Sequence, residues 1–370
     1  MRTKLKKNIV LFVLLLLIVL SIYFLENSKV TPSNTGSNTD QELVQVNGET
    51  YAKAPELTGI SGYLNTNGEE ITIQDYLGDH VILVDFWTYS CINCIRTLPY
   101  LVDWYDRYKD DGLVIIGVHT PEFGFEKEYD NVEMALEKYG IEYPVVQDND
   151  YATWNAFGNR YWPRKYLIDK EGNIRYDHIG EGGYEETEEK IQELLSELNG
   201  KVVEDMSKVS DQTPTTQNTP ELYLGYTFAL PRGQDIGNEE GLQPDQTIDY
   251  TIPTEISPNV VYLTGKWKSL GDYIQAQDEQ SSVLLLNYFA KNLNFVSIPL
   301  EESIEVDVYL DGAYVPESYA GKDLRYDGKR SYLILSSPDL YSVIDGEYGQ
   351  HTIQLFTNST AFTVNSFTFG

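Results

Sequence analysis

The sequence predicts a single N-terminal membrane-anchor helix, then an α/β domain with a mixed sheet covered on both faces, then an all-β antiparallel, jelly-roll-like sandwich. An unbroken apolar run follows a basic N-terminus. Strand and helix patterns alternate over residues 43–199, and strand-like runs separated by Gly, Asp and Pro fill residues 221–370. With 41% hydrophobic residues, the 370-residue chain can bury a core in each of two domains.

Charge and cysteine content exclude several classes of protein. The chain has 27 basic and 57 acidic residues, a net charge of −30, which argues against a nucleic-acid binder. Only two cysteines, Cys91 and Cys94, are present, so a disulfide-rich scaffold and a four-thiolate zinc site are excluded. No histidine stands at ligand spacing to the pair, and we expect neither a metal nor another cofactor.

The N-terminal segment reads as a targeting signal. Four basic residues precede the apolar run 9–25, which is just long enough to span a bilayer. No small-residue cleavage site follows, so we predict that residues 1–30 form an uncleaved anchor in the cell membrane, with a cleaved signal as the alternative. The positive flank stays in the cytoplasm, which places residues 31–370 outside it. Residues 31–42 are polar and read as a flexible stalk.

The middle segment, residues 43–199, alternates strands and helices. We expect a hairpin over 61–73, and buried strands over 81–87, 113–118, 143–146 and 165–168. The last of these pairs with 173–176 as a second hairpin. We expect one helix after the cysteines over 95–105, a second over 132–140 that ends at Gly140, and a third over 191–198 that closes the domain. Residues 200–220 then read as a linker to the sandwich.

The cysteine pair stands between a buried strand and a helix, which is the setting of a redox-active Cys-x-x-Cys motif. Cys91 would lie at the helix N-terminus, where free backbone amides favour a thiolate. Cys94 would lie one turn later on the same face, close enough to form a disulfide. A permanent structural disulfide and half of a metal site are the alternatives, but so short a loop makes a poor staple.

The strings around the cysteines resemble the thioredoxin superfamily, and within it the TlpA/ResA group, over about residues 44–199. Val84–Trp87 resembles the strand that enters the active site. The resemblance implies that Asp85 is the buried acid that relays the proton of Cys94; a solvent-facing strand residue is the alternative. It also implies that Trp162-Pro163 carries a cis peptide bond facing the disulfide, with a trans turn as the alternative.

The same resemblance suggests a substrate-binding surface of Trp162, Pro163, Trp87 and Arg164. Arg164 directly follows the proline, and we hypothesise that its charge lowers the pKa of Cys91. His119 and Glu122 follow the second buried strand, where we expect a surface loop without a direct chemical role.

Further strings look like the soluble part of DipZ-type proteins: residues 86–94, 118–123 and 161–163 and, in the tail, 219–226, 263–267 and 367–370. In those proteins a thioredoxin-like domain and a carbohydrate-binding-like sandwich follow a CcdA-type membrane electron carrier. This chain has one apolar segment, so the resemblance implies a separate CcdA-type donor. We expect the aromatic residues of the tail to serve as core. The alternative is a glycan ligand that stacks on an exposed aromatic such as Trp267.

We therefore predict a membrane-anchored, extracytoplasmic thiol-disulfide oxidoreductase that reduces protein disulfides, in cytochrome maturation or disulfide repair. Cys91 attacks the substrate disulfide, Cys94 resolves the mixed disulfide and Asp85 takes its proton. The alternatives are a thiol oxidase that forms disulfides, a thiol peroxidase, a copper chaperone, and a surface carbohydrate-binding protein with an accessory redox domain. The sequence does not fix the direction of electron flow, because Ile92-Asn93 matches neither a known reductase nor a known oxidase dipeptide.

Overall fold

The computed structural model describes residues 43–46, 48–202 and 205–370. The predicted anchor (9–25) and stalk (31–42) lie outside these residues. No helix among the described residues has the length and apolar character needed to cross a bilayer. The chain divides into two compact units between Ala52 and Lys53. The first contributes an antiparallel pair, β1 (Leu43–Val46) and β2 (Glu49–Lys53), in which Leu43 lies opposite Ala52.

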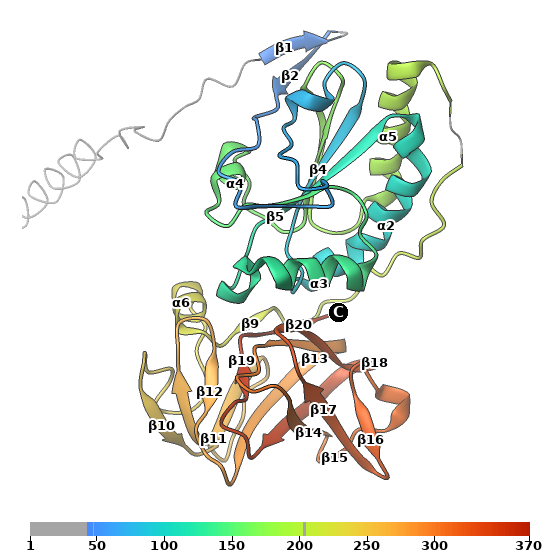
Figure 1. Ribbon diagram of the computed structural model, residues 1–370. Helices are drawn as coiled ribbons and strands as arrows, with labels where there is room; N and C mark the ends of the chain where they lie inside the picture. The colour runs from blue at the N-terminus through green and yellow to red at the C-terminus, as the bar shows by residue number, and fades with distance from the viewer. Residues whose placement is uncertain (1–42, 47, 203–204) are drawn as a thin grey trace, which may run out of the picture. The chain divides into compact units, whose positions relative to one another are not determined.

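The second unit begins with a mixed sheet in the order β8–β7–β4–β5–β6–β3. Figure 1 labels two of its central strands, β4 and β5. Strands β4, β5 and β6 run parallel, and β7, β8 and β3 are antiparallel to their neighbours. The strands are β3 (Gly62–Leu64), β4 (Val81–Trp87), β5 (Leu113–His119), β6 (Val145–Gln147), β7 (Arg164–Ile168) and β8 (Asn173–Ile179). The predicted mixed sheet is confirmed.

Both faces of β4 are buried, because its side chains alternate between two apolar clusters. Leu83 and Trp87 pack on one face with side chains of α2 (Ile92–Tyr108), α3 (Tyr129–Tyr139) and α5 (Tyr184–Asn199). Phe86 packs on the other face, near α4 (Ala152–Ala156). This part also contains the short 3-10 helices η1 (Gln74–Tyr76), η2 (Lys109–Asp111) and η3 (Gly124–Lys127). This double burial explains the continuous apolar run of β4.

The predicted hairpin over 61–73 is wrong. β3 pairs instead with β6, with Tyr63 opposite Val146. Residues 71–73 lead into η1, because the carboxylate of Glu56 accepts hydrogen bonds from the backbone amides of Ile73 (2.6 Å) and Gln74 (3.1 Å). Those amides are therefore not available to a strand ladder.

The C-terminal region is an antiparallel β structure of twelve strands. Its longest strands, β13 and β18, pair along most of their length with two register irregularities, between Ala290 and Asn292 and between Leu293 and Asn294. The elements are β9 (Leu222–Tyr223), α6 (Tyr226–Ala229), η4 (Leu230–Arg232), β10 (Thr247–Tyr250), β11 (Val260–Ser269), β12 (Ile274–Ala276), β13 (Ser282–Ser297), β14 (Ile304–Leu310), β15 (Ala313–Tyr314), η5 (Glu317–Tyr319), β16 (Arg325–Asp327), β17 (Arg330–Leu335), β18 (Asp339–Thr357), β19 (Thr363–Val364) and β20 (Ser366–Phe369).

Strand β11 changes partner at a glycine. It pairs with β13 as far as Thr264 and with β10 from Gly265 onward. Gly265 has φ +82°, and a Cβ there would lie 2.5 Å from the carbonyl oxygen of Ser281. Only glycine fits this position.

The aromatic proposed as a sugar platform, Trp267, is fully buried. Its exposed fraction is 0%, and its indole Nε1 donates a hydrogen bond to the carbonyl of Thr264 (3.0 Å). Phe362 packs edge-on against its ring. The alternative of Trp267 as an exposed sugar-binding residue is therefore excluded, because the ring is part of the core, as the favoured interpretation expected.

The predicted linker has no helix or strand among its described residues, yet it is not detached. Near its middle the carbonyl of Val209 accepts a hydrogen bond from the hydroxyl of Tyr100 in α2 (2.9 Å). Near its end the amide of Thr219 donates to the carbonyl of Phe289 in β13 (2.7 Å). The segment thus contacts both the α/β part and the β region.

Candidate active site

The two cysteines lie at the start of α2, directly after the turn that leaves β4. Cys91 is the N-cap residue with extended backbone (φ −82°, ψ 115°), and its carbonyl accepts the first helical hydrogen bond, from Ile95 (2.9 Å). Its side chain is half-buried, whereas Cys94 is 1% exposed; both are free thiols. This is the arrangement expected of an accessible attacking thiol at a helix N-terminus with a buried resolving thiol behind it.

Asp85 lies in β4 beneath the cysteine pair. Its side chain is 1% exposed, and neither carboxyl oxygen has a hydrogen-bond partner among the described residues. Burial raises the pKa of Asp85 to about 7, although the charge of Lys165 opposes the rise. Burial also raises the pKa of Cys94 well above its ordinary value, and the nearby Cys91 and Asp85 raise it further. The predicted solvent-exposed alternative for Asp85 is excluded.

Lys165, and not Arg164, is the cation after Pro163 that lies near the cysteines. It lies directly opposite Asp85 in the ladder between β4 and β7 and is 1% exposed. Burial lowers the pKa of this ammonium, while Asp85 and Cys94 raise it. Its Nζ donates to the carbonyl of Gly180 (3.3 Å). The available signal was a lysine beside the apolar run 166–168, since a buried lysine needs an acidic partner.

Arg164 does not face the cysteines. Adjacent strand residues point to opposite faces, so Arg164 lies on the face away from Lys165. Its guanidinium pairs with the carboxylate of Asp177 (2.7 Å) and lies 4.6 Å from the ring centre of Tyr166. The prediction that Arg164 binds substrate and adjusts Cys91 is therefore wrong, because the neighbouring lysine occupies that side of the sheet.

The peptide bond between Trp162 and Pro163 is cis, as the resemblance implied. Trp162 lines the same cavity as Cys91. Trp162 is half-buried, packs against Trp154 with ring centres 4.3 Å apart and the rings tilted by 40°, and donates from its indole nitrogen to the carbonyl of Thr120 (3.0 Å). Trp87, by contrast, is fully buried and cannot touch a substrate, so its predicted binding role is wrong.

His119 and Glu122 do not belong to a free surface loop. His119 ends β5, is 0% exposed, and stacks on Tyr89 with ring centres 5.7 Å apart. Burial lowers the pKa of His119 to about 3, so the imidazole is neutral. Glu122 is half-buried, and its carboxylate accepts a hydrogen bond from the hydroxyl of Tyr223 (2.6 Å). The surface-loop prediction is wrong because the C-terminal region covers this segment.

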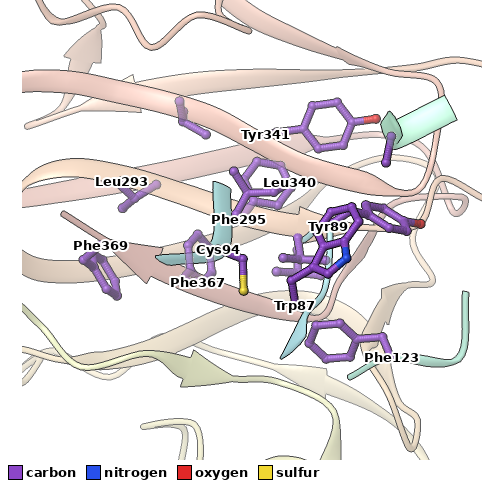
Figure 2. Packing of buried hydrophobic residues seen from close by; sticks show 14 of the residues in the cluster. Trp87, Tyr89, Cys94, Phe123, Leu293, Phe295, Leu340, Tyr341, Phe367 and Phe369 are labelled. Atoms are coloured by element: carbon purple, nitrogen blue, oxygen red, sulfur yellow. The ribbon is translucent and has the colours of Figure 1, made fainter. Parts of the chain in front are cut away.

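A cavity of about 390 Å³ opens in front of Cys91. The α/β part contributes Cys91, Glu122 and Trp162, and the C-terminal region contributes Glu221, Tyr223 and Phe369. Figure 2 shows the apolar packing behind it, where Cys94, Trp87 and Phe123 belong to one buried cluster with C-terminal side chains such as Phe295 and Phe367. The site therefore has walls from two parts of the chain that are far apart in sequence.

An accessible thiol over a buried thiol, with a buried carboxyl group facing a buried lysine, forms a site that can carry out thiol-disulfide exchange on a thioredoxin-like fold. Comparisons with known proteins agree. Residues 51–177 match the model of the AhpC/TSA family, and residues 219–370 match the model of a thioredoxin like C-terminal domain.

Two curated relatives and one solved structure illustrate the similarity. Protein DipZ of Mycobacterium bovis is 41% identical over 252 residues, which are 67% of this chain and 35% of DipZ. Thiol-disulfide oxidoreductase YkuV of Bacillus subtilis is 31% identical over 143 residues, 39% of this chain and 94% of YkuV. The solution structure of a thioredoxin-like protein in its oxidised form is 30% identical, covers 40% of this chain and 97% of its own, and has a TM-score of 0.37.

The chain spans about a third of the length of DipZ. It belongs to the thioredoxin-like family of thiol-disulfide oxidoreductases.

Proposed function

We propose that the protein reduces disulfide bonds of extracytoplasmic protein substrates while residues 9–25 hold it at the cell membrane. The observation that carries the proposal is the burial of Cys94 together with Asp85 and Lys165, beneath an accessible Cys91. This arrangement separates an attacking thiol from a resolving thiol and gives the resolving thiol a proton acceptor.

The reaction proceeds in two exchanges. The thiolate of Cys91 attacks a substrate sulfur; the substrate disulfide breaks, a mixed disulfide forms, and one substrate thiolate leaves. Cys94 then gives its proton to the carboxylate of Asp85 and attacks the sulfur of Cys91, which releases the second substrate sulfur as a thiolate that takes a proton from solvent. The substrate gains two electrons, and the protein is left with a Cys91–Cys94 disulfide.

Lys165 makes this proton transfer feasible. Its positive charge opposes the rise in the pKa of Asp85, so the carboxylate is available near neutral pH despite complete burial. A proton acceptor works best when its pKa lies near the working pH, and a value of about 7 meets that condition.

The reducing direction of this proposal rests on the resemblance to the TlpA/ResA group and to DipZ-type proteins. A reductase needs a separate electron donor, and we propose a membrane carrier of the CcdA type.

The test combines trapping with a reduction potential. C94S should accumulate a mixed disulfide with a protein substrate, whereas C91S should form none. The Cys91–Cys94 potential should lie nearer the about −270 mV of thioredoxin than the about −120 mV of DsbA. A DsbA-like value would overturn the direction, and peroxide turnover that survives C94S would point to a peroxidase. A reporter fused at Gly370 should be extracytoplasmic; a cytoplasmic reporter would refute the localisation.

A further inference from the structure

The cavity beside Cys91 holds two carboxyl groups that one phenol brings together. The hydroxyl of Tyr223 lies 2.6 Å from Glu122 and 3.0 Å from Glu221. A phenol has one proton and can donate to only one of the two carboxylates. Both short contacts are made when the other carboxyl group carries a proton and donates it to the phenol oxygen, so this geometry can hold one proton, shared between Glu122 and Glu221, in the wall of the active-site cavity.

The surroundings keep that proton on the glutamates. Burial raises the pKa of both carboxyls, to about 7 for Glu221, and the charge of Glu221 raises the pKa of Glu122 further, while the hydrogen bond from Tyr223 lowers both. Glu126 adds to the repulsion from the α/β side, while the guanidinium of Arg232, which lies 4.5 Å from the ring centre of Tyr223, opposes it. A protonated carboxyl at neutral pH can act as a general acid.

A second set of hydrogen bonds ties Glu122 to the nucleophile. Buried Glu126 accepts hydrogen bonds from the hydroxyl of Ser90, next to Cys91, and from the backbone amides of Glu122 and Phe123. Because one carboxylate holds both segments, Glu126 is a positioning residue that fixes Glu122 relative to Cys91. Both Glu122 and Cys91 line the same cavity of about 390 Å³, so a bound disulfide can touch both.

We propose that Glu122, held with Glu221 by Tyr223, protonates the substrate thiolate that departs when Cys91 attacks. The Cys91–substrate disulfide forms, the substrate disulfide breaks, and the proton of Glu122 passes to the leaving sulfur. The carboxylate left behind is stabilised by the hydroxyl of Tyr223 and the charge of Arg232, and it recovers a proton from solvent. The proposal rests on the reductase function above and assigns the C-terminal region part of the chemistry.

General acid catalysis matters most when the leaving thiolate is a strong base. Alkyl thiols have pKa values near that of free cysteine, about 8.5, whereas the aromatic thiol released by 5,5′-dithiobis(2-nitrobenzoate) is far more acidic. The test therefore compares single-turnover oxidation of the reduced full-length protein by hydroxyethyl disulfide and by the aromatic disulfide. The readout is the ratio of the two rate constants.

In E122Q, which keeps the size of the side chain and an acceptor for Tyr223, the alkyl-to-aromatic ratio should fall at least tenfold. Glu122→Asp should recover part of the ratio. E133Q, a matched change at an exposed carboxyl on α3, should keep the wild-type ratio. An E122Q ratio equal to that of the wild type, including a uniform loss with both reagents, would overturn the proposal. C91S should lose both reactions, as the proposed reductase function requires. If both reactions survive in C91S, the reductase function itself is refuted, and not only the role of Glu122.

Discussion

Replacing Asp85 by Asn should stabilise the protein at neutral pH and leave it little changed in acid. The folded protein keeps a proton on Asp85 up to about pH 7, whereas the unfolded chain releases that proton near the ordinary pKa of 3.8. Between these values the folded state binds more protons than the unfolded state, so the free energy of unfolding falls as pH rises. Asn carries no such penalty.

The magnitude follows from the shift. A carboxyl pKa that moves from 3.8 to about 7 on folding corresponds to about 4 kcal/mol, lost progressively between about pH 4 and pH 7. The D85N variant should therefore gain up to about 4 kcal/mol over the wild type by pH 8. The assay is urea unfolding of both reduced proteins, followed by fluorescence, from pH 4 to pH 8.

The control is D110N, which changes an exposed aspartate just after α2. Its difference from the wild type should not vary with pH to the same extent. A D85N difference that is constant from pH 4 to pH 8 would refute the reasoning, because it would show that Asp85 is ionised in the folded protein throughout. D85N should also slow the attack of Cys94 on the mixed disulfide. A variant that is more stable but resolves the mixed disulfide more slowly would separate the catalytic role of Asp85 from the cost of its burial to stability.

Three further outcomes follow. Lys165→Met should raise the pKa of Asp85 and move the pH profile of mixed-disulfide resolution to higher pH, measured by stopped flow; an unmoved profile would contradict the ladder pairing. Arg164→Ala should leave the pH profile of Cys91 alkylation where it is, and a shift would restore the hypothesis that we rejected. Trp267→Ala should lower the free energy of unfolding by about 3–5 kcal/mol in a denaturant titration, whereas a sugar-binding tryptophan would cost little.

The α/β part was largely predictable because its signals are local. A continuous apolar run becomes a strand buried on both faces, and Gly140 ends α3 in the left-handed conformation (φ +65°) that favours glycine. The failure at 71–73 has a tertiary cause, since the carboxylate of Glu56 takes the amides that a strand would need. Sequence periodicity contains no information about such a partner.

Side-chain direction was the main limit on the site. The sequence placed a cation after Pro163, but the register between β4 and β7 decides which one faces Asp85. That register puts Lys165 beside the cysteines and Arg164 on the opposite face. In the C-terminal region, the local strand-like runs do not show how far β13 and β18 extend, because both strands continue past polar residues through register irregularities.

The C-terminal region is part of the environment of the redox centre. Phe123, in the loop after β5, is 1% exposed and contacts Phe228 with ring centres 5.3 Å apart, and Lys138 of α3 pairs with Asp339 of β18 (2.5 Å). The alignment with YkuV covers 94% of YkuV but 39% of this chain, so it leaves most of this chain unaligned. Here, however, the loop that carries Glu122 is covered by side chains of the C-terminal region, and Tyr223 holds its carboxylate. Removing that region would expose Phe123 and free Glu122, so the rate of attack on alkyl disulfides should depend on a part of the chain that contains no cysteine.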